Sequence, residues 1–232
     1  MTIRWGIIGT GDVAERKGGP ALYKAERSSL VAVTNRTLEK ANAFAARHGN
    51  PTVYASAEEL VASDEVDAVY VATAPDSHTE FTKLAAQAGK HVLCEKPMAM
   101  SVEEAQQMIG VCAEHNVSLV LAFYRRVFPV VQKMKSLLDD GAIGRPLSIF
   151  VQTYAPFASP SAVPWRLDPK VSGGGFLMDM GSHRFDLFVH FFGEAESVTG
   201  FAEKQTLSTE IDDAATVSIR FANGVLGTAS FH

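Results

Sequence analysis

Over its first half the chain alternates short apolar runs with segments of helical character. Because two strands joined through a helix usually run parallel, this strict alternation predicts a parallel, doubly wound sheet covered by helices on both faces. Val69–Ala72 and Leu119–Ala122 are apolar throughout, as strands buried on both faces are. The expected strands are Ile3–Ile8, Leu30–Thr34, Thr52–Ala55, Ala68–Ala72, His91–Cys94 and Ser118–Ala122, and the expected helices are Thr37–His48, Ala57–Ala62, Ser77–Ala88 and Val102–His115.

Near residue 123 the pattern changes to longer strands separated by turns. Asn223-Gly224 lies between the last two strand-like runs and is typical of a hairpin turn. We therefore expect two domains, a doubly wound α/β domain over 1–122 and a second α/β domain over 123–232 with a largely antiparallel open sheet. Because His232 falls within a strand pattern, we expect that sheet to be incomplete. The elements expected there are helices over 128–138 and 176–192, strands over 147–154, 198–203, 215–221 and 225–231, and a Pro- and Ser-rich loop over 156–164.

The composition is that of a globular protein, with 47% hydrophobic and 20% charged residues. A formal net charge of -5 and the lack of a basic tract argue against nucleic acid as a partner. No apolar run has the length of a membrane span, and the N-terminus has no secretory pattern. Cys94 and Cys112 lack metal or redox spacing, so we expect two reduced thiols in a cytoplasmic protein.

A glycine motif, G-x-G-x-x-A, directly follows the first strand and ends at Ala14. Its first glycine permits a tight turn, its second lets the main chain approach a pyrophosphate, and the small third residue lets the helix pack on the strand. N–H groups at the start of the next helix would bind the phosphates. The motif alone is weak, but its place in a βαβ series favours a dinucleotide site. The residues expected to contact the cofactor are Gly9, Thr10, Gly11, Asp12 and Val13.

The end of the second strand indicates which dinucleotide binds. An acidic residue there would hydrogen-bond the ribose 2′-hydroxyl of NAD, but this chain has Asn35 and Arg36. The missing carboxylate removes repulsion against a 2′-phosphate, and a guanidinium can bind that phosphate with two hydrogen bonds. We therefore expect NADP(H) to be preferred, with NAD(H) possible. The alternative is that Arg36 is simply solvated.

Two further loops follow strands at the edge where open α/β sheets bind ligands. In the first loop, Thr73, Ala74, Pro75 and His78 are expected to line the nicotinamide ribose, while Asp76 or Ser77 could equally cap the next helix. The second is Glu95-Lys96-Pro97, which would point a lysine at whatever the nucleotide site holds. A lysine at a strand end is often only solvated, so its meaning depends on its surroundings.

Asp179 and His183 stand four apart on the helix expected over 176–192, which places them on one face. A carboxylate there can orient an imidazole and raise its basicity for acid–base chemistry. Asp186 and His190 extend the stripe, so a metal site is an alternative. Because their neighbours are apolar, we interpret Asp186 and His190 as helix packing or interdomain contacts.

Taken in order, these motifs resemble the Gfo/Idh/MocA oxidoreductase family. The order is Gly9–Ala14, Thr73-x-Pro75-x-x-His78, Glu95-Lys96-Pro97, and Gly173–Gly175 followed by Asp179-x-x-x-His183, and it covers essentially the whole chain. The resemblance implies a Rossmann domain, an α/β domain with an open sheet, and hydride exchange between a nicotinamide and a sugar or cyclitol hydroxyl. It also implies that Lys96, Asp179 and His183 are catalytic, that Glu95 and Lys96 lie at the cofactor, and that Tyr124, Arg125, Trp165 and Arg166 line the substrate.

We therefore expect an NADP(H)-dependent oxidoreductase acting on a sugar, cyclitol, polyol or dihydrodiol. The first alternative is a non-catalytic NADP(H)-binding module of the same fold, which would not need Lys96, Asp179 and His183 together. The second is a metal-assisted lyase or hydrolase built on the Asp/His stripe. The resemblance also implies further strands, with a flat face through which the second sheet could form a homo-oligomer.

Overall fold

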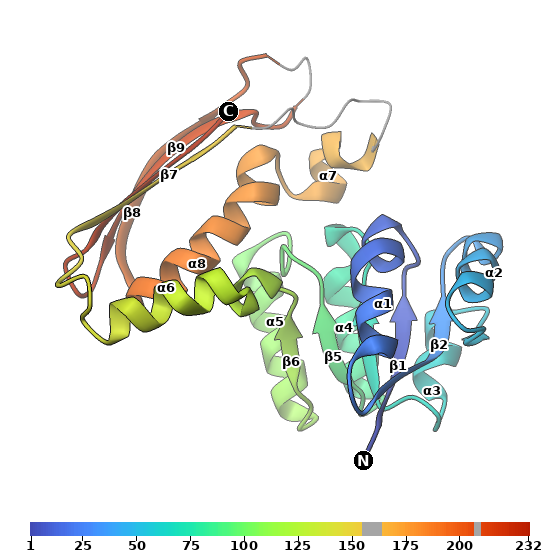
Figure 1. Ribbon diagram of the computed structural model, residues 1–232. Helices are drawn as coiled ribbons and strands as arrows, with labels where there is room; N and C mark the ends of the chain where they lie inside the picture. Colours follow the sequence, from blue (N-terminus) through green and yellow to red (C-terminus); the bar gives the residue numbers. More distant parts are fainter. Residues whose placement is uncertain (155–163, 207–209) are drawn as a thin grey trace. The chain divides into compact units, whose positions relative to one another are not determined.

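The computed structural model describes residues 1–154, 164–206 and 210–232, which include most of each half of the chain (Figure 1). These residues divide into two compact units, Met1–Ala122 and Phe123–His232. The expected loop over 156–164 lies outside the described residues except for Pro164. Within the described residues, every helix is too short or too polar to cross a bilayer.

The first unit is built on a six-stranded sheet in the order β3-β2-β1-β4-β5-β6. Every pair of neighbouring strands is parallel, which confirms the doubly wound sheet expected from the alternation. In this order the chain turns from one half of the sheet to the other between β1 and β4, where such folds bind nucleotides. The strands are β1 (Ile3–Ile8), β2 (Ser28–Thr34), β3 (Thr52–Val53), β4 (Ala68–Val71), β5 (His91–Cys94) and β6 (Leu119–Leu121).

Strand β4 shows why both faces of this sheet are buried. Val69 and Val71 point into one apolar cluster with Leu60 and Met108. The intervening Tyr70 points into a second cluster that contains Phe44. Because successive side chains of a strand alternate between the two faces, each face must be covered by helices.

The helices of the first unit end close to the expected residues. Ser101 accepts a hydrogen bond from the Glu104 N–H, as a helix cap does, while the Glu104 carboxylate reaches back to the Met100 N–H. The helix after the glycine loop was not delimited from the sequence. It contains a π-helical turn, η1 (Ala14–Gly18), that leads into α1 (Gly19–Lys24). The others are α2 (Leu38–Arg47), α3 (Ala57–Ala62), α4 (His78–Gln87) and α5 (Val102–Glu114).

The second unit contains a four-stranded sheet in the order β7-β10-β9-β8. Strand β9 (Ala214–Phe221) pairs antiparallel with β8 (Ala195–Glu203) and with β10 (Leu226–Phe231), whereas β7 (Ser148–Thr153) runs parallel to β10. The largely antiparallel sheet is confirmed. The Asn223-Gly224 hairpin is wider than a two-residue turn, because the Phe221 N–H donates to the Val225 carbonyl across it.

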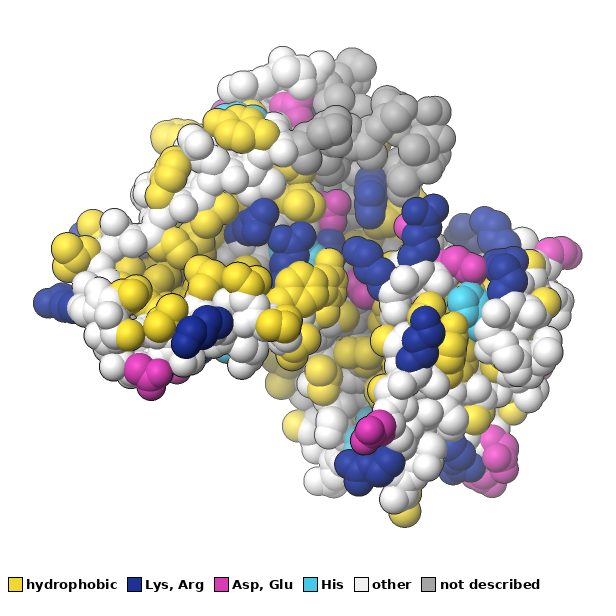
Figure 2. All heavy atoms as spheres, in the orientation of Figure 1, with side chains coloured by type: hydrophobic (Ala, Val, Ile, Leu, Met, Phe, Trp, Pro, Cys, Tyr) yellow, Lys and Arg dark blue, Asp and Glu magenta, His cyan; other side chains and the backbone are white. Residues whose placement is uncertain are grey.

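One face of this second sheet is covered. Phe188 and Phe192 of α8 (Ser182–Phe192) pack with Phe221 and Phe231 of the sheet, and the opposite face leaves Phe201 78% exposed. Apolar side chains also lie on the surface over α6, where Val130 is exposed (Figure 2). The remaining helical segments are η3 (Tyr124–Val127), α6 (Pro129–Asp139), η4 (Pro164–Leu167), α7 (Pro169–Ser172) and η5 (Leu177–Gly181).

Candidate active site

The glycine loop has the shape that a phosphate cradle requires. Gly9 has a φ of 97°, and a Cβ atom there would come within 2.9 Å of the Ala72 main chain. At Gly11 a Cβ atom would meet nothing within 4 Å, so the main chain borders open space. Ala14 is fully buried where the helix meets the sheet. A pyrophosphate therefore fits beside Gly11, since a helix start also leaves N–H groups without intrahelical acceptors.

The other residues of the loop are placed around this opening. The Glu15 N–H donates to the Gly11 carbonyl at 2.9 Å as the helix begins. Asp12 is exposed and forms an ion pair with Arg16, with 2.7 Å between Oδ1 and Nε. Val13 is half-buried against the apolar cluster beneath the loop. Of these residues, Gly11 and Asp12 are the ones that lie open to solvent.

The end of β2 lies beside the glycine loop. Asn35 Nδ2 donates a hydrogen bond to Thr10 Oγ1 at 3.0 Å, and Asn35 Oδ1 accepts one from the Thr37 N–H at 2.9 Å. Both contacts fix the turn that presents Arg36, which is exposed. No acidic side chain occurs from Val33 to Thr37, so the guanidinium has no neighbouring carboxylate within its own turn.

The loop after β4 turns through a short 3₁₀ segment, η2 (Pro75–Ser77). Ser77 is the N-cap residue of α4 (His78–Gln87), but its side chain makes no capping hydrogen bond. Its hydroxyl donates instead to Thr73 Oγ1 at 2.9 Å, within the loop. Thr73 and Ala74 are half-buried, and Pro75 is buried beneath them.

His78 lies in the interior, between the two loops that follow β4 and β5. Its side chain has no exposed surface; Nδ1 lies 2.9 Å from the Pro97 carbonyl oxygen and Nε2 lies 3.2 Å from that of Thr73. Burial lowers the pKa of the imidazole, although the nearby carbonyl groups oppose this effect. His78 thus joins two main-chain segments, whereas we expected it to contact the cofactor.

The lysine turn at the end of β5 is built on a buried carboxylate. Glu95 is 7% exposed; Oε1 accepts a 2.6 Å hydrogen bond from the Tyr70 hydroxyl, and Oε2 accepts one of 3.2 Å from the Lys96 N–H. The Lys96-Pro97 peptide bond is cis. Burial, and then the charge of Glu95, raise the pKa of the Tyr70 phenol, so the phenol remains a donor. Lys96 itself is half-buried.

In the second unit, aromatic and charged side chains surround the Asp179/His183 pair. His183 is 4% exposed, and the Tyr124 ring lies edge-on to its ring with 5.3 Å between centroids. Asp179 Oδ2 lies 3.9 Å from Arg166 Nε, and the Arg166 guanidinium lies 5.5 Å from the centre of the Trp165 ring. The structure therefore places Tyr124 with His183 and Arg166 with Asp179, while Trp165 lies against Arg166. Asp179 lies in the π-helical turn η5, one turn before His183 in α8.

Asp186 and His190, which continue the Asp/His stripe along α8, contact other side chains of the second unit. Both carboxylate oxygens of Asp186 accept hydrogen bonds from Arg126 Nε, at 2.8 and 2.9 Å, within the second unit. His190 lies further along α8, against Phe191. Within residues 1–154, 164–206 and 210–232, no three His, Cys, Asp or Glu side chains are grouped as a metal site requires. The Asp186 carboxylate is already bound to the Arg126 guanidinium, which favours a structural role over metal binding.

Two arginines, Arg125 of η3 and Arg184 of α8, lie on the segments that also carry Arg126 and Asp186. Burial, and then the charge of Arg125, lower the pKa of Arg184, whose Nε donates to Thr153 Oγ1 at 3.3 Å. A nearby like charge disfavours the charged form of a side chain. Arg125 therefore belongs to a positively charged part of the second unit, next to Tyr124.

Asp212 is a structural residue that the sequence did not reveal. Its carboxylate oxygens accept hydrogen bonds from the N–H groups of Gly175 and Leu177, each at 2.8 Å. A Cβ atom on Gly175 would lie 1.9 Å from the Asp212 carbonyl oxygen, so only glycine fits there. This contact fixes the start of the helix that carries Asp179.

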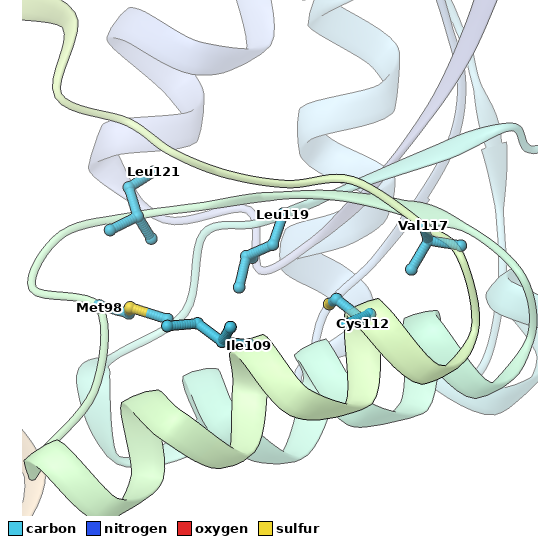
Figure 3. Close-up of a pocket in the computed structure, with 7 residues that line it drawn as sticks. Met98, Ile109, Cys112, Val117, Leu119 and Leu121 are labelled. Atoms are coloured by element: carbon cyan, nitrogen blue, oxygen red, sulfur yellow. The ribbon is translucent and has the colours of Figure 1, made fainter.

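An apolar groove of about 400 Å³ lies elsewhere in the first unit, between α5 and β6 (Figure 3). Met98, Ile109, Leu119 and Leu121 point into it, together with Cys112, whose thiol pKa is raised by burial. These side chains offer no acid, base or charged hydrogen-bond donor. We therefore place the chemistry at the polar loops and not in this groove.

A parallel sheet of this strand order, with a glycine loop after its first strand, is the architecture of dinucleotide-dependent oxidoreductases. The chain belongs to the GFO/IDH/MocA family. Residues 3–123 match the family model described as an oxidoreductase family with an NAD-binding Rossmann fold, and residues 131–232 match the GFO/IDH/MocA C-terminal domain. The resemblance drawn from the motifs is confirmed, and the protein is an NAD(P)-dependent oxidoreductase.

Similar proteins agree with this assignment. "Oxidoreductase P35" of Formosa agariphila is 40% identical over 99% of this chain and 73% of its own length. The "1,5-anhydro-D-fructose reductase" of Ensifer adhaerens is 34% identical over 99% of this chain and 68% of its own length. The crystal structure of an aldose-aldose oxidoreductase from Caulobacter crescentus, complexed with glycerol, has a TM-score of 0.92 at 28% identity and covers 100% of this chain and 71% of that one. This chain thus spans about seven-tenths of the length of these proteins.

Proposed function

We propose that the protein transfers a hydride between NADP(H) and a hydroxyl or carbonyl carbon of a sugar, cyclitol or related polyol or dihydrodiol. The observation that carries this proposal is the lysine turn, in which Lys96 follows a carboxylate fixed at the end of β5. A charged donor at that edge of the sheet suits a substrate oxygen that develops negative charge. The names of the relatives, a reductase of 1,5-anhydro-D-fructose and an aldose–aldose oxidoreductase, support a carbohydrate-like substrate.

Residues 1–122 would hold the cofactor. The main chain from Gly9 to Val13 would bind the pyrophosphate, Asn35 and Arg36 the 2′-phosphate, and the loop Thr73–Pro75 the nicotinamide ribose. NADP(H), when bound, supplies or accepts the hydride. The open space beside Gly11 and the exposed guanidinium of Arg36 support this assignment.

The proton would be handled by His183. Oxidation of a secondary alcohol needs a base for the hydroxyl proton, and reduction needs the corresponding acid. We assign this role to the imidazole of His183 and assign its orientation to Asp179. Lys96 would donate a hydrogen bond to the reacting oxygen, and Glu95 would hold the main chain of Lys96 in place. Loss of one such group costs about 10²–10⁴-fold in rate.

Residues 123–232 would bind the substrate. Tyr124 lies at His183, Arg166 lies at Asp179, and Trp165 lies against Arg166, so their ring faces and donors suit a polyhydroxylated ligand. Arg125 would contribute positive charge beside Tyr124. The exposed apolar side chains of the second sheet, including Phe150 and Phe201, support association of two copies through that face. A cytoplasmic location stays a prediction.

The experiment tests a panel of substrates and measures turnover by the absorbance of reduced nicotinamide. We would assay 1,5-anhydro-D-fructose, D-xylose, myo-inositol and a trans-dihydrodiol with both NADP(H) and NAD(H). With the best substrate, Lys96→Met is expected to lower kcat by about 10²–10⁴-fold. Lys83→Met is the matched control, because Lys83 is also half-buried and its ammonium binds Gln107 on the neighbouring helix. Turnover by Lys96→Met equal to that of Lys83→Met would contradict the proposed role of Lys96.

The same assay separates the enzyme from a non-catalytic NADP(H)-binding module. Such a module would bind NADPH and turn over no member of the panel. An enzyme would lose turnover in Lys96→Met and in His183→Gln while each variant still bound NADPH. Purified protein would be analysed for metal in parallel, since a bound metal needed for turnover would favour the metal-assisted alternative.

A further inference from the structure

The carboxylate beneath Lys96 is buried at the end of β5. Glu95 is 7% exposed, and an ionised carboxylate is stable in such a place only when donors surround it. Its two oxygens use different donors, the Tyr70 hydroxyl at 2.6 Å and the Lys96 N–H at 3.2 Å. The orientation of the carboxylate is therefore fixed on one side by a phenol and on the other by the main chain that carries the reactive amine.

The phenol has little freedom to move. Tyr70 is 1% exposed on β4, between Ile7 of β1 and Leu93 of β5. The helix that follows the glycine loop closes over its ring, since a Cβ atom on Gly18 would come within 2.2 Å of the ring Cε1 and 2.5 Å of the hydroxyl oxygen. The phenol thus has the helix on one side and the carboxylate on the other.

We infer that Tyr70 is a positioning residue for Lys96, which it holds through the Glu95 carboxylate. This inference rests on the proposed role of Lys96. The relay runs from the ring of Tyr70 to Oε1 of Glu95, and from Oε2 of the same carboxylate to the N–H of Lys96. Removing the hydroxyl leaves the ring, the strand and the apolar packing in place, but frees one end of the carboxylate. The main chain of Lys96 then loses a fixed acceptor.

Amide hydrogen exchange followed by NMR tests the relay in the full chain without substrate or cofactor. In Tyr70→Phe the Lys96 amide is expected to exchange at least about tenfold faster than in the wild type, while the Leu93 amide in β5 keeps its rate. Tyr54→Phe is the matched control, because it also removes one phenol hydrogen bond, a 2.9 Å contact to Ser63, within the same unit. An unchanged rate at Lys96 in Tyr70→Phe, or equal acceleration at Leu93, overturns the inference.

Kinetics separate positioning from a general structural role. With NADPH and 1,5-anhydro-D-fructose, or the best substrate of the panel, Tyr70→Phe is expected to lower kcat about tenfold and to leave the KM for NADPH within about twofold. In a Glu95→Gln background the same substitution is expected to have little further effect on kcat, because both changes break one relay. If the losses in kcat caused by Tyr70→Phe and by Glu95→Gln instead multiply in the double variant, the two residues act independently and the inference is overturned.

The two proposals can fail separately. Full turnover in Lys96→Met would overturn the role of Lys96 and leave the exchange result standing. An inactive Lys96→Met beside a fully active Tyr70→Phe would overturn the positioning role alone. Gly18→Ala, whose Cβ would push against the ring, is expected to reproduce the faster exchange at Lys96.

Discussion

Asn35 Nδ2 donates a hydrogen bond to Thr10 Oγ1 at 3.0 Å, and this contact joins the end of β2 to the glycine loop. Because Asn35 Oδ1 also accepts the Thr37 N–H, the turn around Arg36 is held from both sides. An exposed guanidinium on a fixed turn is well placed to meet a phosphate that emerges beside the loop.

Arg36→Ala is expected to weaken binding of NADPH by about tenfold or more, because the proposed charged contact to the 2′-phosphate would be lost. Binding of NADH, which lacks that phosphate, is expected to stay within about twofold. Fluorescence titration measures the affinities for NADPH and for NADH at low and at high salt. The ratio of the two affinities in the wild type is expected to fall as the salt concentration rises, because salt screens the charge of the phosphate. Lys40→Ala on the exposed side of α2 is the control. An equal loss of both affinities would count against a phosphate contact.

Gly11→Ala tests the opening of the phosphate cradle. Since a Cβ atom at Gly11 meets nothing within 4 Å, thermal unfolding is expected to be almost unchanged. Dinucleotide affinity is expected to fall at least about tenfold, because the methyl group would occupy the space proposed for the pyrophosphate. Gly9→Ala gives the contrast, since its Cβ would strike the Ala72 main chain and destabilise the fold itself. Wild-type affinity in a stable Gly11→Ala protein would argue against the cradle.

Local patterns predicted most of the strands and the parallel sheet. The structure has the strand His91–Cys94 and the helix Ala57–Ala62 at the bounds that the sequence predicts. The helix begins there because the Ser56 hydroxyl accepts a hydrogen bond from the Glu59 N–H. Helical spacing and the family resemblance predict Asp179 and His183 as catalytic residues, and that role stays a prediction. The π-helical turns at Ala14–Gly18 and Leu177–Gly181 were not predicted, since a single turn of i→i+5 bonds is too short to change the apolar periodicity of its segment.

Contacts between residues distant in sequence could not be predicted. Tyr70 meets Glu95 only because β4 and β5 are neighbours in the sheet. A tyrosine inside an otherwise aliphatic strand was the one available indication, since a buried phenol needs a partner. Asp212 binds Gly175 across 37 positions, and no spacing in the sequence indicates that contact.

His78 should make stability depend on pH. Burial lowers its pKa below the usual 6.5, so the folded state binds the proton less readily than the unfolded state. Its contribution is therefore complete above pH 6.5 and is lost as pH falls below that value, by up to about 1.4 kcal/mol per pH unit. Urea unfolding gives the free energy of unfolding at pH 7.5 and at pH 5.5. The decrease between the two pH values should be smaller in His78→Gln than in the wild type or in His115→Gln, which changes an exposed histidine. An equal decrease in all three proteins would contradict a contribution of His78 to the pH dependence.

Gly175→Ala should destabilise the second unit and disturb the helix that carries Asp179. Its Cβ would lie 1.9 Å from the Asp212 carbonyl oxygen, and a main-chain atom cannot turn aside as a flexible side chain can. The main chain must shift, which costs about 1–3 kcal/mol, and the N–H contacts to Asp212 lengthen with it. Thermal unfolding measures the loss. Gly110→Ala, in the middle of α5 with nothing within 4 Å of its Cβ, should instead gain about 0.5–1 kcal/mol. A Gly175→Ala protein as stable as Gly110→Ala would show that Asp212 does not fix the start of this helix.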